Sequence, residues 1–155
     1  MPGKIEQRLA ALKIALPATP APAGNYVPYV VAGTLVFVAG QLPFQDGKVA
    51  HPGKLGAGVS IEDGQKAARL CALNLIAQVK AACGGDLERV ARCVKLTGFV
   101  NATPEFADHP KVVNGASDLM AEVFGDKGRH ARAAVGTSSL PLGAAVEIDA
   151  IFEIR

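Results

Sequence analysis

The sequence predicts an α+β domain in which a mixed β-sheet carries two long helices on one face. Two long segments have helical spacing of apolar residues, and short Val-rich segments typical of strands lie between and around them. A chain of 155 residues that is 50% hydrophobic can build one core, so we expect a single domain over 1–155. The opposite face of such a sheet then needs cover, from the N-terminal helix or from other subunits.

Residues 1–16 predict a short amphipathic helix, because Ile5, Leu9 and Leu12 recur at helical spacing with polar residues between them. Three prolines follow within residues 17–25. Since proline cannot continue a helix, we expect this segment to be an extended Pro-rich linker.

The next segment predicts two strands joined by a tight turn. Tyr29–Ala32 and Leu35–Ala39 are rich in valine and are separated by Gly33 and Thr34. We expect the glycine-rich stretch over 44–59 to form a hairpin or loop. Its GKLGAG sequence lacks the GxxxxGK[ST] spacing of a phosphate-binding loop, so it does not predict a nucleotide site.

Two long helices follow from end signals as well as from spacing. Ser60 can cap a first helix that we expect over 63–82, with acidic residues in its first turn. Pro110 begins the second helix and Gly125 ends it. The apolar residues expected to face inward on the second helix are Val112, Val113, Ala116, Leu119, Met120 and Val123.

Three further strands are expected at Arg92–Val100, Ala133–Ser138 and Val146–Ile154. Strict alternation in the first of them places Cys93 on the same face as Lys95. In the last strand Val146, Ile148, Ala150, Phe152 and Ile154 share one face, and Glu147, Asp149 and Glu153 share the other.

The charge pattern argues against two classes of function. The net charge is only +2 and the basic residues do not cluster, unlike the dense basic surface of a dedicated nucleic-acid binder. The longest apolar stretch, Val27–Phe44, is interrupted by prolines and glycines and does not predict a membrane span. The N-terminus is charged where a signal peptide would be apolar, so we expect a soluble, cytoplasmic protein.

The cysteines and histidines predict neither a disulfide framework nor a metal site. The three cysteines are an odd number without a CxxC pair, and the three histidines are far apart in the sequence. We therefore expect three buried free thiols and no metal. These residues are Cys71, Cys83, Cys93, His51, His109 and His130.

Two charged residues are candidates for function. Arg132 belongs to the segment 129–132, which lies between a glycine-terminated helix and an apolar strand. An arginine there either lies on the surface or points into a pocket, where its planar fork can hold a carboxylate by two parallel hydrogen bonds. Glu147 lies early on the last strand and is either a solvated residue or part of a site.

The same regions carry a resemblance to a known family. The chain resembles the YjgF/Rid family, the reactive intermediate deaminases also labelled L-PSP endoribonucleases, over about Pro20 to Ile154. The N-terminal helix and the longer GKLGAG loop exceed the usual family length and are typical of a longer subgroup of about 155 residues. The matching pieces are Gly24-Asn25-Tyr26, Leu35 to Pro43, Lys95 to Val100, Asn114, Arg132 to Val135, Leu140-Pro141 and Val146-Glu147-Ile148.

The resemblance implies a chorismate mutase-like fold, a homotrimer and a cleft between subunits. It also implies hydrolysis of enamines and imines, such as 2-aminoacrylate and other 2-imino acids, to a 2-keto acid and ammonia, without a cofactor. Arg132 matches the arginine that anchors the substrate carboxylate, and Tyr26, Asn114 and Glu147 match other residues of the cleft. An imine is already electrophilic, so orienting it beside a water, which Glu147 could activate, is the main task.

Two departures bear on the substrate. Ala39 stands where the family often has serine, and Ala134 stands where typical deaminases have cysteine. Two other functions remain open: a non-catalytic trimer that binds a small carboxylate, and an endoribonuclease or translation inhibitor. The last has the least support, because the chain has six phenylalanines, two tyrosines and no tryptophan for base stacking, and no histidine pair for RNA cleavage.

Overall fold

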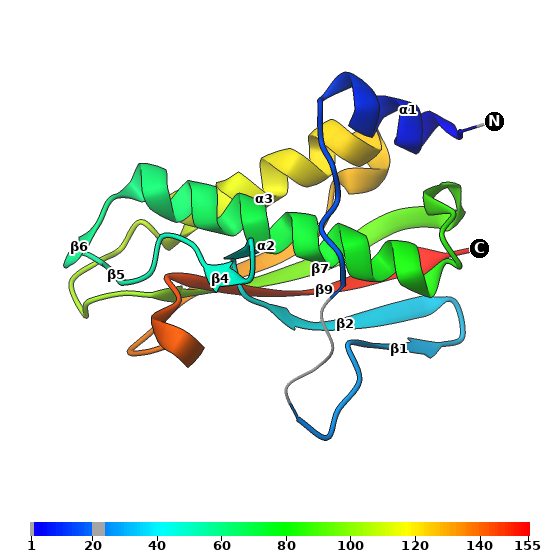
Figure 1. Cartoon of the computed structure of the whole chain (residues 1–155). Helices are drawn as coiled ribbons and strands as arrows, with labels where there is room; N and C mark the ends of the chain where they lie inside the picture. The colour runs from blue at the N-terminus through cyan, green and yellow to red at the C-terminus, as the bar shows by residue number, and fades with distance from the viewer. Residues whose placement is uncertain (1, 20–23) are drawn as a thin grey trace.

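The computed structural model describes residues 2–19 and 24–155, so part of the predicted linker at 20–23 lies outside the described residues. A five-stranded sheet lies under a layer of helices (Figure 1). The elements are α1 Lys4–Ala11, β1 Tyr29–Ala32, β2 Leu35–Gln41, β3 Phe44–Gln45, β4 Lys48–Val49, β5 Lys54–Leu55, β6 Gly58–Val59, α2 Ile61–Ala82, β7 Val90–Asn101, α3 His109–Phe124, β8 Ala131–Thr137 and β9 Val146–Ile154.

The sheet is mixed, as the sequence predicts. Its strand order is β1-β2-β9-β7-β8, with β7 and β8 parallel and the other neighbours antiparallel. Helix α2 packs over β2 and β9, and α3 packs over β7 and β8, so both long helices cover the same face (Figure 1). This arrangement confirms the α+β prediction with two helices on one face.

The core lies between that helix layer and the sheet. The inward face of β9 is buried along its whole length, from Val146 to Ile154, as its alternation predicts. From α3, Val113, Leu119 and Met120 are fully buried against it. All three cysteines are free and buried, which confirms that part of the sequence analysis.

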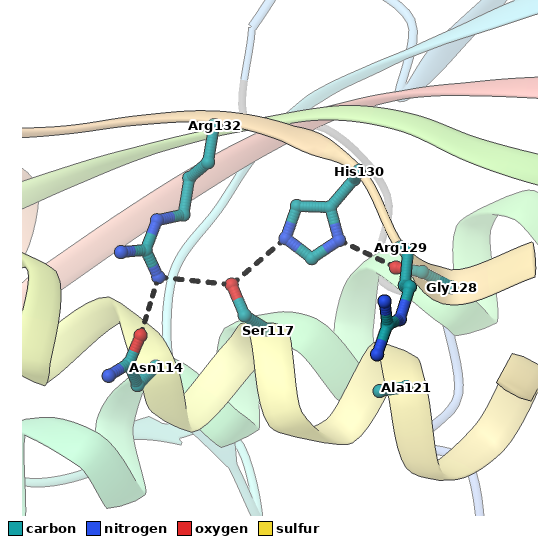
Figure 2. A pocket seen from close by; sticks show the side chains of 7 residues that line it. All are labelled: Asn114, Ser117, Ala121, Gly128, Arg129, His130 and Arg132. Atoms are coloured by element: carbon teal, nitrogen blue, oxygen red, sulfur yellow. Dashed lines mark hydrogen bonds between the residues drawn. The ribbon is translucent and has the colours of Figure 1, made fainter. Parts of the chain in front are cut away.

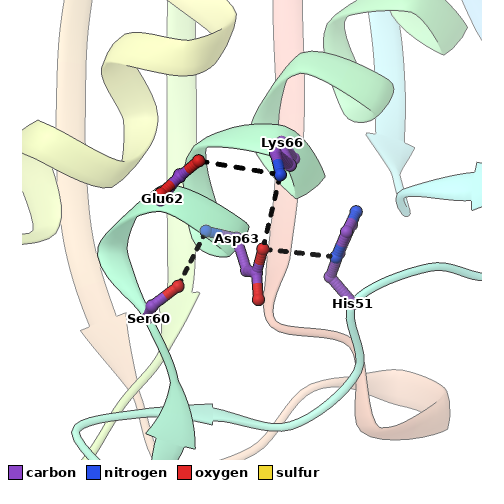
Figure 3. Close-up of polar contacts among 5 residues, drawn as sticks. All are labelled: His51, Ser60, Glu62, Asp63 and Lys66. Atoms are coloured by element: carbon purple, nitrogen blue, oxygen red, sulfur yellow. Dashed lines mark hydrogen bonds and ion pairs between the residues drawn. The ribbon is translucent and has the colours of Figure 1, made fainter.

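The N-terminus of α2 is capped as predicted (Figure 3). The Ser60 hydroxyl accepts a hydrogen bond from the Asp63 amide at 3.1 Å, and the Asp63 carboxylate faces Lys66 at 3.8 Å. We expect Ser60→Ala to lower the free energy of unfolding by about 1 kcal/mol, because one helix amide loses its acceptor. Urea denaturation should show the loss in Ser60→Ala and near wild-type stability in Ser60→Asn, whose side chain can also cap; equal stability of Ser60→Ala and wild type would contradict it.

The helix predicted within residues 1–16 is shorter than expected, because α1 ends at Ala11. Lys13 adopts the left-handed conformation with φ of 57°, and the Ile14 amide donates to the Leu9 carbonyl at 2.9 Å. This is the Schellman arrangement that usually ends a helix at glycine. Spacing misled here because Ile14 still packs on the core after the helix has ended.

Helix α1 does not cover the open face of the sheet, which was one of the two expectations for that face. It lies on the helix side, beside α3 (Figure 1). The Ile5 amide donates to Glu88 at 2.6 Å, and Arg8 donates to the Val123 carbonyl at 3.1 Å. The open face therefore keeps exposed apolar side chains, among them Val30 and Phe37 on β1 and β2.

Two predicted strands also differ from the structure, one in the residue where it begins and the other in which residues share a face. Strand β8 begins at Ala131, so it includes Arg132. In β7 a register shift between Cys93 and Lys95 turns Cys93 toward the core, so the predicted shared face of these two residues is wrong. A bulge places two residues opposite one, which strict alternation cannot foresee.

No helix within residues 2–19 and 24–155 is long and apolar enough to cross a bilayer.

Candidate functional site

Arg132 lies on the edge strand β8 and reaches across to α3 (Figure 2). It is paired with Leu96 on β7, which faces the helices, so the Arg132 side chain also lies on the helix side. Its Nη1 donates to Asn114 Oδ1 at 2.7 Å and to Ser117 Oγ at 3.1 Å. Asn114 and Ser117 are three residues apart, which puts them on one face of α3.

The guanidinium of Arg132 is held only by neutral groups. Within the part of the chain that the structure describes, its hydrogen bonds all use Nη1, and it forms no ion pair. Nη2 and Nε keep donors for an incoming acceptor. A fixed guanidinium without a carboxylate partner is suited to a carboxylate supplied by a ligand.

The space in front of this guanidinium is an open hollow of about 390 Å³. Its lining includes a second guanidinium, that of Arg129, and no acidic side chain among the described residues. The charge of the hollow therefore favours an anion. The lining residues are Asn114, Ser117, Ala121, Gly128, Arg129, His130 and Arg132 (Figure 2).

His130 lies between the Ser117 hydroxyl and the backbone. Its Nε2 is 2.9 Å from Ser117 Oγ, and its Nδ1 is 2.6 Å from the Gly128 carbonyl oxygen (Figure 2). Burial lowers the pKa of His130 below its usual value and the charge of Arg132 lowers it further, whereas the hydrogen bond with the Gly128 carbonyl raises it. The imidazole is therefore neutral at neutral pH.

Glu147 lies on the opposite face of the sheet from Arg132. It is paired with Phe99, three residues along β7 from Leu96, and this stretch of β7 keeps a regular register, so Phe99 and Leu96 face opposite sides. Burial raises the pKa of Glu147, and the nearby charge of Asp149 raises it further. The Glu147 carboxylate lies against Gly40, where a Cβ would come within 2.3 Å of Oε2.

Tyr26 is 56% exposed, just before β1. The next residue, Val27, lines a second hollow of about 450 Å³ on the open face, together with Ala39, Lys95 and Asp149. Burial raises the pKa of Asp149, while a hydrogen bond with Thr97 and the charge of Lys95 lower it. Asp149 lies two residues after Glu147 on β9, so both side chains are on the same face, and this second hollow is on the Glu147 side of the sheet.

The structure brings together Arg132 and Asn114 of the predicted site residues, and it leaves Glu147 and Tyr26 elsewhere in the same chain. Sequence reasoning missed Ser117 and His130. Ser117 lies three residues after Asn114, and His130 lies two residues before Arg132. These spacings indicate a shared site only once it is known that α3 packs across β8. Within residues 2–19 and 24–155 no three His, Cys, Asp or Glu side chains gather as metal ligands.

The two positions that depart from the family pattern lie on different sides. Ala134, two residues after Arg132 on β8, is paired with Gly98 and packs against the core. Ala39 lies where the β2 register shifts and lines the hollow on the open face. Neither alanine takes part in the hydrogen bonds between Arg132 and α3.

The fold agrees with the comparisons with known proteins. The family model described as "YjgF/chorismate_mutase-like, putative endoribonuclease" matches residues 6–153. The chain belongs to this family and has its chorismate mutase-like fold.

Individual relatives cover nearly the whole chain. Protein TCP17 of Trypanosoma cruzi is 52% identical over 99% of this chain and 96% of its own. The protein Atu1372 of Agrobacterium tumefaciens, of unknown function, is also 52% identical, with a TM-score of 0.91 over 97% of this chain and 92% of that chain. TdcF of E. coli, solved with bound serine, is 25% identical, with a TM-score of 0.63 over 88% and 93%.

Proposed function

We propose that this protein hydrolyses reactive 2-imino acids and their enamine forms, such as 2-aminoacrylate, to 2-keto acids and ammonia. Arg132 anchors the substrate carboxylate, and Asn114 holds the guanidinium in place at 2.7 Å. The observation that carries this proposal is a guanidinium fixed by neutral partners in a hollow lined by cations and neutral groups. Serine bound to the relative TdcF also carries a carboxylate beside a nitrogen-bearing carbon, which supports this ligand class.

The complete cleft in this proposal forms between two copies of the chain, in a homotrimer. Arg132 and Glu147 lie on opposite faces of one sheet, so Glu147 and Tyr26 must come from a neighbouring copy to meet Arg132. Exposed apolar side chains on the open face support such an assembly: Val30 is 52%, Phe37 43% and Val135 45% exposed.

In this reaction the protein mainly has to position the imine and the water, because the imine needs little further activation. The carbon of an imine is already electrophilic, so a fixed carboxylate and a fixed water bring the reacting atoms together. Glu147 of the neighbouring copy positions the water, and Tyr26 lines the same wall. No cofactor takes part in this scheme, since water is the only second reactant.

The proposal is tested by following 2-keto acid formation from freshly generated imines. An amino-acid oxidase produces 2-iminopropanoate from alanine, and semicarbazide traps the imine that remains. We expect the protein to speed keto acid release and to reduce trapping, compared with heat-denatured protein. Saturable binding of a small carboxylate without any acceleration would instead identify a non-catalytic carboxylate binder.

A further inference from the structure

A chain of hydrogen bonds in the Arg132 hollow leads to a group that can take up a proton. Arg132 Nη1 donates to Ser117 Oγ at 3.1 Å, and Ser117 Oγ lies 2.9 Å from His130 Nε2. His130 Nδ1 lies 2.6 Å from the Gly128 carbonyl oxygen. The members come from three different places: the helix α3, the edge strand β8 and the turn that precedes β8.

The chemistry of the groups decides which one donates and which one accepts in each of these hydrogen bonds. A carbonyl oxygen can only accept, so Nδ1 of the neutral His130 ring carries the hydrogen and Nε2 carries a lone pair. Arginine can only donate, so Ser117 Oγ accepts from Arg132 and turns its own hydrogen toward Nε2. Ser117 is thus a hydroxyl whose proton already points at a neutral base.

From this geometry we infer that Ser117 and His130 form the proton-transfer pair of the Arg132 hollow, taking the proton of the attacking water. The inference rests on the proposed imine hydrolysis and names the group that the proposal leaves out. In a 2-imino acid the imine carbon is bonded directly to the carboxylate carbon. A carboxylate held by Arg132 therefore places the reacting carbon next to Ser117.

The protons balance over two steps. In the first step the water oxygen bonds to the carbon of the protonated imine, and the C=N π electrons move to nitrogen. The water gives one proton to Ser117 Oγ while the Ser117 proton moves to His130 Nε2, which leaves a neutral carbinolamine. In the second step His130 returns this proton through Ser117 to the nitrogen, the C–N bond breaks, and ammonia leaves with the bonding electrons. The hydroxyl gives its proton to bulk water as the keto group forms, so the one excess proton of the protonated imine ends in solvent.

A serine in mid-helix commonly returns its hydroxyl to a carbonyl of its own helix. Ser117 instead reaches across to β8 and the turn before it, and its partners line an open hollow. The charged side chains that line the hollow with His130 are Arg129 and Arg132, whereas α3 contributes neutral residues. Burial and the charge of Arg132 lower the pKa of His130 despite its hydrogen bond with the Gly128 carbonyl, so the ring stays a proton acceptor at neutral pH.

The test measures kcat, KM and the pH profile for 2-iminopropanoate hydrolysis in Ser117→Ala, Ser117→Thr and His130→Gln. Glutamine can still accept the Ser117 hydrogen bond, but it is not a base. We expect about a 100-fold lower kcat in Ser117→Ala and His130→Gln, with KM within about 3-fold of wild type. Ser117→Thr keeps a hydroxyl and should retain most of the activity.

The pH profile separates proton transfer from mere support of Arg132. In wild type, activity should fall at acid pH as His130 becomes protonated, below its usual pKa of about 6.5. His130→Gln should lack this acid limb. If Ser117→Ala and His130→Gln fold and keep a kcat near that of wild type, the inference is overturned and the proposed function is left intact. The same holds if these variants raise KM without lowering kcat. A wild type without any turnover would overturn both.

Discussion

Replacing Arg132 with alanine is expected to reduce kcat/KM for small 2-imino acids by about 100- to 10,000-fold. The guanidinium would hold the carboxylate by two charge-assisted hydrogen bonds, and each such bond contributes about 1.5–3 kcal/mol. Because Arg132 is already fixed by Asn114 and Ser117, little side-chain freedom is lost when the ligand binds. The keto acid assay with oxidase-generated imines measures this loss directly.

Two further variants make the Arg132 result specific. Arg132→Lys keeps the charge but loses the planar fork, so we expect it to recover only a small part of the activity. Arg69→Ala removes a guanidinium that pairs with Glu122 at 3.6 Å, away from the hollow lining, and should stay within about 2-fold of wild type. A folded Arg132→Ala that hydrolyses imines as fast as wild type would exclude this site.

Gly115→Ala is expected to destabilise the protein by about 3 kcal/mol, the largest stability effect we predict. Gly115 lies on α3 where this helix meets α2, and a Cβ there would come within 2.1 Å of the Gln65 carbonyl oxygen. That contact is with backbone, so relief requires the two helices to move apart. Thermal denaturation should show a melting temperature about 6–12 °C lower than that of wild type.

Helix propensity and close helix packing predict opposite effects for Gly115→Ala. Helix propensity alone predicts that alanine stabilises a helix by about 1 kcal/mol relative to glycine. Asp118→Ala, an exposed change on the same helix, is the control and should stay within about 0.5 kcal/mol of wild type. A Gly115→Ala variant as stable as wild type would show that α2 and α3 do not pack this closely.

The sequence was sufficient for most of the fold because local signals and apolar periodicity agree there. Ser60, Pro110 and Gly125 mark helix ends where the structure has them, and the alternation of Val146–Ile154 matches its burial. It was insufficient at Lys13 and Cys93, where a left-handed residue and a bulge break the expected period. Neither feature has a glycine or proline that would have signalled it.

The site was less predictable than the fold because its geometry depends on which strands are neighbours. Arg132 and Asn114 could be named from a family resemblance, and the structure places them 2.7 Å apart. Ser117 and His130 carry no motif, since their contact arises only where α3 crosses β8. The opposite placement of Glu147 follows from its pairing with Phe99, which requires the strand order.

The central claim is that Arg132 of one copy and Glu147 of another copy together form the cleft that hydrolyses imines. Arg132→Ala and Glu147→Ala should each be nearly inactive alone, because the first loses the carboxylate anchor and the second loses the group that positions the water, while both still fold and assemble. When the two variants are co-expressed in equal amounts, random assembly gives about one intact cleft in four, so we predict about 25% of wild-type activity. Activity no greater than that of the separate variants would contradict a cleft shared between copies.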